Sequence, residues 1–186
     1  LFRSNEDIYE TNYLFNNNGN DYGPFAARYP GRLGNSVTVH VCANTSTFST
    51  WSYKNYFTSA PTTSDFADSV GGSNDEMHIV VVDQDGLFTG AAGAILETYA
   101  FVSSASDAVI NGVTNYYKQV IFNNSKYIYA MDPVDYVTTS TSWGQSAAGR
   151  TFATPATNQV VNLSTGSSVN PTDANIENSY DLFSNK

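Results

Sequence analysis

Basic residues are scarce in this sequence, and so is charge in general. Lys and Arg together number 8 against 17 for Asp and Glu, which leaves a formal net charge of −9. Proteins that bind nucleic acids or anionic membranes neutralise phosphates with clusters of Lys and Arg, and the sequence has no such cluster. We therefore expect neither nucleic acid nor membrane as a partner. Charged residues make up only 13% of the chain, so Asn, Ser, Thr and Gly must cover much of its surface.

Cysteine is nearly absent, and long apolar runs are missing. Cys42 is the only cysteine, which excludes an internal disulfide framework and a cysteine-based zinc site. No run approaches the roughly 18 apolar residues of a membrane span, and no signal peptide opens the chain. Leu1 stands where an initiator Met would be, so we expect a piece of a longer protein. The 186 residues, 41% hydrophobic and 14% aromatic, are enough for a packed domain.

The strongest structural signal lies near the centre of the chain. Residues 77–82 (MHIVVV) are a short run of mostly branched apolar residues, typical of a strand covered on both faces. Turn residues 83–86 (DQDG) follow, and residues 94–102 (AILETYAFV) form a second strand-length run. We interpret these runs as a long, loosely turned hairpin at the centre of a sheet. Strict alternation would place one set of side chains on one face of the second strand, namely Leu96, Thr98, Ala100 and Val102.

A helix and a third strand are predicted next. Asn111 or Thr114 would cap the start of the helix, residues 123–125 (NNS) would end it, and residues 127–131 (YIYAM) would form the strand. This order predicts an α+β fold: a two-layer α/β sandwich with helices packed on a mixed sheet, plus a β-rich, loop-rich peripheral region. The helix is indicated by an apolar stripe with the spacing i, i+3, i+4, i+7, i+8, formed by Val113, Tyr116, Tyr117, Val120 and Ile121.

The N-terminal part of the chain precedes this core. We assign residues 1–75 to it and residues 76–134 to the strand-strand-helix-strand core. Within the first part, residues 37–42 alternate between Val and other residues and predict a half-buried strand. Residues 43–74 are rich in Ser, Thr, Asn and Gly, and we expect a loop pinned by the aromatic residues of 51–57, because large rings bury much area.

Two further segments follow the core. Residues 136–149 are rich in Thr, Ser, Gly and Gln around Trp143, and we predict that residues 135–170 form a variable β/loop insertion with one short strand over 159–163. Residues 171–186 are predicted to form a helix that returns to the core. Its apolar face would consist of Ile176, Tyr180 and Phe183.

No motif for metal binding is complete. Asp83-x-Asp85-Gly86 resembles the start of a calcium loop, but Ala94 stands where such a loop has its bidentate Glu. A hairpin turn explains the acidic residues better, and we expect no metal site. His40 and His78 both lie in predicted strands, where a hydrogen-bonded core or interface histidine is the ordinary expectation.

Signs of catalysis are equally weak. The sequence has no Gly-x-Ser-x-Gly motif, and Cys42 lacks the surroundings that lower a thiol pKa. The glycine-rich residues 90–93 are not followed by the Lys-Ser/Thr of a phosphate loop. We therefore expect no catalytic residue and no cofactor. Paired carboxylates occur only in polar turns or at element ends, at Glu6/Asp7, Asp75/Glu76 and Asp83/Asp85.

Several stretches resemble one protein family. Residues 25–37 (FAARYPGRLGNSV) are similar to a signature of the tail sheath proteins of contractile-tailed phages of the T-even type. The other similar stretches follow in the same order as in that family, and only residues 136–170 lack a clear family pattern. They are residues 71–86 (GGSNDEMHIVVVDQDG), 93–97 (GAILE), 116–121 (YYKQVI), 125–129 (SKYIY) and 180–183 (YDLF).

The resemblance implies a structural role. Sheath subunits form a helical tube around the inner tail tube, and the sheath contracts to drive that tube through the host envelope. The expected partners are other sheath subunits and, through portions of the subunit absent here, the tail tube and the baseplate. The expected location is the virion, after synthesis in the bacterial cytoplasm. The family joins neighbours through terminal strands that this chain lacks, so we expect the isolated chain to be monomeric.

The resemblance carries over no catalytic residue, so the residues we single out are structural. Pro30, Gly31 and Gly34 are assigned to a turn, and Gly86 and Gly93 to the hairpin. Tyr116, Tyr117 and Val120 are assigned to packing of the helix on the sheet.

Two other functions remain open on the sequence. One is a receptor- or carbohydrate-binding β-rich module of a phage appendage, with an aromatic-lined cleft near Trp51 or Trp143. The other is a hydrolase built from the many Ser and Asp residues.

Overall fold

A four-stranded antiparallel sheet lies at the centre of the computed structural model, which describes residues 23–168, 172–174 and 177. The strand order is β4-β3-β2-β8. The α+β class is confirmed. All pairs of strands in this sheet are antiparallel in the described residues, since each strand runs opposite to the strand beside it. A mixed sheet had been expected. The four strands are β2 (Val37–Cys42), β3 (Glu76–Asp83), β4 (Ala94–Ser103) and β8 (Gln159–Asn162).

A second layer covers one face of this sheet. It contains the helix α4 (Tyr117–Asn124) and a small antiparallel ladder between β1 (Phe25–Ala27) and β7 (Ile128–Ala130). The prediction that the third strand joins the hairpin in one sheet is wrong: β7 pairs with β1 instead. β2 and β4 already occupy both edges of β3, and β7 lies in the covering layer, where β1 supplies the partners that its backbone groups require.

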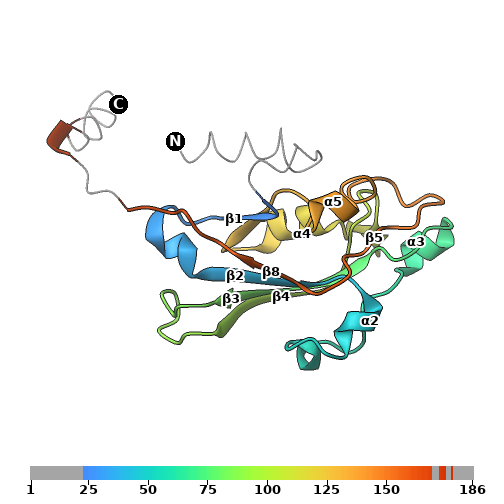
Figure 1. Ribbon diagram of the computed structural model, residues 1–186. Helices are drawn as coiled ribbons and strands as arrows, with labels where there is room; N and C mark the ends of the chain where they lie inside the picture. The colour runs from blue at the N-terminus through green and yellow to red at the C-terminus, as the bar shows by residue number, and fades with distance from the viewer. Residues whose placement is uncertain (1–22, 169–171, 175–176, 178–186) are drawn as a thin grey trace.

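The remaining elements are short and surround these two layers. Figure 1 shows β1, α4 and α5 on one side of the central sheet and α2 on the other. None of the helices in the described part of the chain has the length and apolar character that a bilayer crossing requires. These shorter elements are η2 (Gly31–Ser36), α2 (Thr45–Phe48), η3 (Lys54–Tyr56), α3 (Asp65–Ser69), β5 (Val109–Ile110), β6 (Val113–Thr114) and α5 (Tyr136–Thr139).

Apolar side chains fill both faces of the central sheet. Val39 and Val81 belong to the main core under α4 and β7, whereas Val80 belongs to a second cluster with Trp51. The prediction that β3 is covered on both faces is therefore confirmed. The prediction that β2 is only half-buried is wrong, since five of its six residues are buried. The aromatic residues of 48–57 cover the face that the alternating pattern had assigned to solvent.

Two irregularities interrupt the ladder between β3 and β4. The register shifts between Val81 and Val82 and again between Met77 and Ile79. Each shift places an extra residue on β4, and an extra residue reverses the alternation of side chains beyond it. Tyr99 therefore belongs to the same core cluster as Val102, against the strict alternation expected from the sequence.

Helix α4 begins later than predicted. Its N-cap is Tyr116, and the expected caps lie before it in a separate hairpin, Asn111 in the turn and Thr114 in β6. Asn111 has a φ of 52° and Gly112 a φ of 79°, and two positive φ values in succession are what a tight hairpin turn requires. The hairpin thus takes Val113 away from the helix. The predicted end is confirmed, since Ser125 is the C-cap.

The described part of the predicted insertion, residues 135–168, makes close contact with the core. Its strand β8 is the fourth strand of the central sheet, and Trp143 is buried against Tyr117 at a ring-centroid distance of 5.5 Å. The division of the chain into four segments stays a prediction. The helix expected over 171–186 lies largely outside the described residues.

Tyr117 offers a direct test of the packing of α4. Its side chain is 1% exposed and contacts the rings of Tyr116 and Trp143. Replacing it with Ala should lower the free energy of unfolding by about 3–5 kcal/mol, because the change leaves a cavity and removes a large apolar surface. Chemical denaturation measures this loss. The exposed Asn123→Ala variant on the same helix should change stability by less than about 1 kcal/mol, and equal stabilities of the two variants would contradict the packing described.

Candidate interaction surface

The turn residues assigned from the sequence lie between β1 and β2. Pro30 precedes the 3-10 helix η2 with a φ of −71°. Gly31 has a φ of 77°, in the left-handed region that favours glycine. Gly34 has a different constraint, because a Cβ there would lie 2.5 Å from the carbonyl oxygen of Tyr29 and 2.7 Å from the Cβ of Ala27. The turn therefore has no space for a side chain at residue 34.

The turn of the β3–β4 hairpin is organised by the carboxylate of Asp83. Its Oδ1 accepts a 2.6 Å hydrogen bond from the Ser36 hydroxyl, and its Oδ2 accepts bonds from the backbone N–H groups of Phe88 and Thr89 and from the Thr89 hydroxyl. Burial alone would raise the pKa of Asp83, but these hydrogen bonds outweigh it and lower that pKa. The acidic residue thus shapes the loop, which agrees with its interpretation as a hairpin turn.

The two glycines assigned to this hairpin have different surroundings. Gly86 has a φ of 77°, and a Cβ there would lie 2.7 Å from the backbone nitrogen of Ala92. Gly93 has a φ of 79°, but no atom lies within 4 Å of the corresponding position. Both positions favour glycine through their φ, and only Gly86 is also enclosed.

The three residues assigned to helix packing lie where α4 meets the sheet. Tyr116 and Tyr117 are each 1% exposed, and Val120 is partly buried against the same core. Next to them, Lys118 is fully buried. Burial lowers the pKa of Lys118 to about 8, while the negative charge of Asp132 acts in the opposite direction. The electrostatic interaction with Asp132 links α4 to the chain that follows β7.

His78 is held in one neutral tautomer. Its Nε2 lies 2.9 Å from the carbonyl oxygen of Ser59, and its Nδ1 accepts a 3.1 Å hydrogen bond from the backbone N–H of Phe101. Since a carbonyl can only accept, the proton must be on Nε2. The ring stacks on Phe57 at 4.2 Å. Burial lowers the pKa of His78 below its ordinary value of 6.5, against the effect of the bond to Ser59.

The other titratable groups do not converge on a reaction centre. His40 lies on the neighbouring strand with its Nε2 3.3 Å from the Tyr53 hydroxyl. Asp75 is buried and accepts hydrogen bonds from Ser64 and Ser103. Within residues 23–168 and the few described beyond them, no three His, Cys, Asp or Glu side chains are grouped as a metal site would need.

The two tryptophans are not available as a platform for sugars. Trp51 is 5% exposed and stacks on Phe57, and Trp143 is 2% exposed with its Nε1 donating to the carbonyl oxygen of Ala153. A sugar stacks on an exposed aromatic face. The rings of these two residues pack in the core and in the second cluster, so they do not line the cleft that the alternative function would use.

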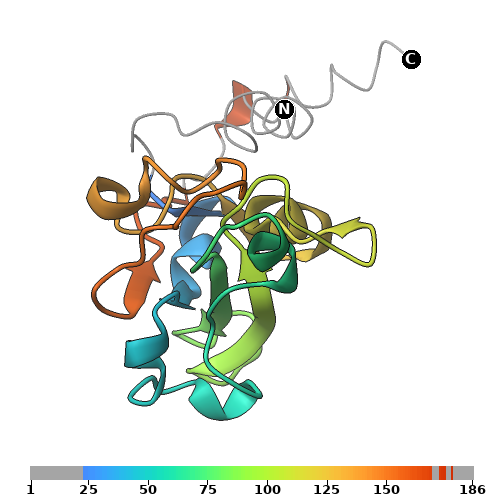
Figure 2. The same ribbon diagram turned by 90° about the vertical axis from the view of Figure 1, so that its right-hand side faces the viewer.

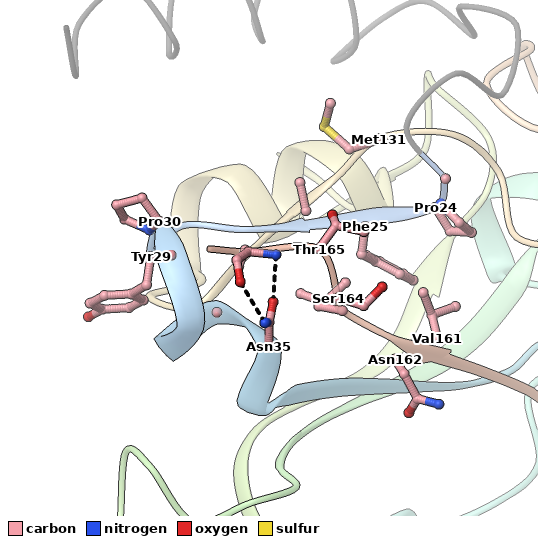
Figure 3. Close-up of a pocket in the computed structure, with 17 residues that line it drawn as sticks. Pro24, Phe25, Tyr29, Pro30, Asn35, Met131, Val161, Asn162, Ser164 and Thr165 are labelled. Atoms are coloured by element: carbon pink, nitrogen blue, oxygen red, sulfur yellow. Dashed lines mark hydrogen bonds between the residues drawn. The ribbon is translucent and has the colours of Figure 1, made fainter. Parts of the chain in front are cut away.

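An open groove of about 520 Å³ lies between β1 and the segment that follows β8 (Figure 3). The hydrogen bonds between Asn35 and the backbone of Gly166, at 2.8 and 2.9 Å, hold its floor. We call it the β1–β8 groove. Its lining contains no Asp, Glu, Lys or Arg and consists of Gly23, Pro24, Phe25, Ala26, Ala27, Tyr29, Pro30, Gly31, Gly34, Asn35, Met131, Val161, Asn162, Leu163, Ser164, Thr165 and Gly166.

The sequence reasoning missed this groove and the small hairpin before α4. The hairpin had a clear signal, because Asn-Gly between two pairs of β-forming residues is typical of a two-residue hairpin turn. The groove had none, since Phe25 and Val161 come from opposite ends of the chain and meet only in the fold. The turn residues Pro30, Gly31 and Gly34 do line it.

Part of the chain is similar to a known phage protein. The tail sheath protein of Salmonella phage ViI is 39% identical over 71 residues, which is 38% of this chain and 9% of that protein. The matched part thus spans less than a tenth of the relative's length. No protein-family model matches the sequence.

The two hairpin glycines provide a matched pair of variants. Gly86→Ala should destabilise the protein more than Gly93→Ala, because both introduce a side chain at positive φ, at a cost of about 1–2 kcal/mol, and only Gly86→Ala also forces a Cβ against the backbone of Ala92. Thermal unfolding of the two variants measures the difference. Equal melting temperatures would show that the loop relaxes freely around residue 86.

His78 predicts a loss of stability in mild acid. Because its pKa is lowered in the folded state, the unfolded chain binds more protons below about pH 6.5, and the free energy of unfolding falls as the pH drops from 7.5 to 5.5. One such group limits the slope to about 1.4 kcal/mol per pH unit. His78→Gln, whose amide can still donate and accept, should flatten this slope when unfolding is measured at several pH values.

His40→Gln is the matched control for this prediction. Burial also lowers the pKa of His40, but its ring is only half-buried and has one hydrogen-bond partner shown, Tyr53. Its replacement should flatten the slope less than that of His78. A slope in His78→Gln as steep as in the unaltered protein would contradict the neutral, buried state of His78.

Proposed function

We propose that this chain is part of the structural subunit of a contractile phage tail sheath, the helical tube that surrounds the tail tube and shortens to drive it through the host envelope. The role is mechanical and non-enzymatic. The observation that supports it most directly is the 39% identity over 71 residues with the tail sheath protein of phage ViI. The ordered series of similar stretches along most of the sequence supports the same role.

The architecture suits a body that moves as a unit. The central strand β3 is buried on both faces, and the polar groups at its two ends are bound internally, Asp75 to Ser64 and Ser103, and Asp83 to Ser36 and Thr89. Packed interiors of this kind resist gradual deformation. A sheath that contracts by rigid-body movement of its subunits requires such units.

The proposed partners follow from this role. Other sheath subunits are the immediate neighbours, in head-to-tail contacts that extend into a helix. The tail tube and the baseplate are partners of the whole subunit, reached through portions outside this chain. The proposed location is the virion, after synthesis in the host cytoplasm. With a net charge of −9, neither nucleic acid nor an anionic membrane is proposed as a partner.

The two alternative functions have less support. The carbohydrate-binding module was suggested by the content of Tyr, Trp, Asn and Ser, and the two tryptophan rings are buried. The hydrolase depended on a Ser, a His and an acid in one place. His78 instead directs its two ring nitrogens to the backbone of Ser59 and Phe101.

Labelling of intact tails tests the proposed role. Gold-labelled antibodies raised against the purified chain should decorate the tails of the parent phage along their whole length in both extended and contracted tails, as seen by electron microscopy. Antibodies absorbed beforehand with the purified chain are the control and should leave the tails bare. Label confined to fibres or to the tail tip would refute the sheath role and favour an appendage module.

A further inference from the structure

The hairpin formed by β5 and β6 exposes several apolar side chains close together. Val109 is 41% exposed, Ile110 50% and Val113 67%. Figure 2 shows this hairpin, in yellow-green, projecting on the right beside the green helix α3. Apolar side chains exposed in a cluster mark interaction sites, whereas apolar residues exposed singly need no explanation.

A pocket of about 340 Å³ lies between this hairpin, α3 and the start of β3. Phe66, Val109 and Ile110 supply its apolar lining, and Asp65 and Glu76 supply two carboxylates. No Lys, Arg or His is among the residues that line it. The pocket therefore combines apolar surface with negative charge that its own lining does not neutralise.

Hydrogen bonds hold the walls of this pocket in place. The backbone N–H of Glu76 donates to the carbonyl oxygen of Thr62 at 3.1 Å, and the N–H of Thr62 donates to Oε2 of Glu76 at 3.0 Å. Ser64, the N-cap of α3, donates from its N–H and its hydroxyl to the buried carboxylate of Asp75. Strand pairing between β5 and β6 fixes the third wall. A partner thus meets a preformed surface, which loses little conformational entropy on binding.

The ionised form of Glu76 is disfavoured in this pocket. Burial raises the pKa of Glu76, and the nearby charges of Asp75 and Asp65 raise it further, while the hydrogen bond from the N–H of Thr62 lowers it. Within the described residues, Oε1 of Glu76 accepts no hydrogen bond. A positive charge in the pocket would offset the repulsion, since a nearby opposite charge favours the ionised carboxylate.

A basic side chain fits these features better than a metal ion does. Hard metal ions gather several oxygen ligands, and in the part of the chain that the structure describes no three His, Cys, Asp or Glu are grouped for that purpose. Lys and Arg side chains combine a positive head with an aliphatic stem. The head suits the two carboxylates and the stem suits the apolar lining. Val113 lies outside the lining and extends the apolar surface beyond the pocket.

We propose that this pocket binds a Lys or Arg side chain of a partner protein, whose apolar neighbours rest on Ile110 and Val113. The positive head pairs with Asp65 and Glu76, and the stem packs against the apolar lining. The net charge of −9 attracts a basic partner and steers its approach. The inference stands independently of the sheath role, because it depends only on the surface of this chain.

Titration of the full chain with short peptides tests this proposal. The probe is acetyl-Leu-Arg-Leu-amide, and the NMR signals of the backbone amides of Asp65, Glu76 and Ile110 should shift together as it binds. The peptide should bind about fivefold more tightly than acetyl-Leu-Gln-Leu-amide, which lacks the positive charge. It should also bind more tightly than acetyl-Gly-Arg-Gly-amide, which lacks the apolar neighbours.

Two variants that lose the same charge separate the pocket from the general negative field. Glu76→Gln keeps an oxygen that accepts from Thr62, and it should weaken binding of the Leu-Arg-Leu peptide about fivefold. Asp68→Asn is the matched control, because Asp68 is exposed on α3 but does not line the pocket. Its affinity should stay within about twofold of the unaltered chain, since salt screens a charge outside the pocket.

Two results would overturn the proposal. One is an equal loss of affinity in Glu76→Gln and Asp68→Asn, which would show attraction to the overall charge alone. The other is displacement of the peptide by calcium chloride at equal concentration, which would assign the carboxylates to a metal ion. Neither result affects the labelling of tails, so failure of this contact is distinguishable from failure of the sheath role.

Discussion

Burial of β3 on both faces is the constraint on which the rest of the structure depends. A strand of eight residues with only its first residue partly exposed needs a strand on each edge and a covering layer on each face. β2 and β4 occupy the edges. The layer of α4, β1 and β7 covers one face, and the aromatic segment before β3 covers the other. Apolar burial on this scale is the main source of folding free energy.

Asp83, His78 and Glu97 are hydrogen-bonded within the fold, and these bonds give the loops their shapes. Asp83 binds the backbone of the hairpin turn, and His78 joins the aromatic segment to β4 through Ser59 and Phe101. Glu97 on β4 accepts hydrogen bonds from the Tyr99 and Ser125 hydroxyls, which ties the sheet to the end of α4. A buried polar group without such a partner would be costly, so each bond fixes the position of the segment it reaches.

The edges of the central sheet differ from its centre. Its centre is filled by side chains, and the described polar clusters bind backbone and hydroxyl groups of the chain itself. The groove beside β8 is instead open and has no charged residue in its lining, and the hairpin after β4 exposes apolar side chains.

The sequence by itself determined the local elements of the core. Branched apolar runs located β2, β3 and β4, the polar residues after Val82 located the hairpin turn, and the residues ending at Ser125 located the end of α4. Ordered stretches also suggested the sheath family. These features are encoded by neighbouring residues, since side-chain periodicity and turn chemistry act over a few positions.

Only the tertiary structure decided which elements meet. The pairing of β7 with β1, the addition of β8 to β2 and the burial of both tryptophans join residues from distant parts of the chain. The irregular register of β4 reversed its side-chain alternation, and the groove exists only because β1 and β8 come together. Such outcomes depend on which strand edges and apolar surfaces pair best in the whole fold. The pattern of neighbouring residues in the sequence does not determine that choice.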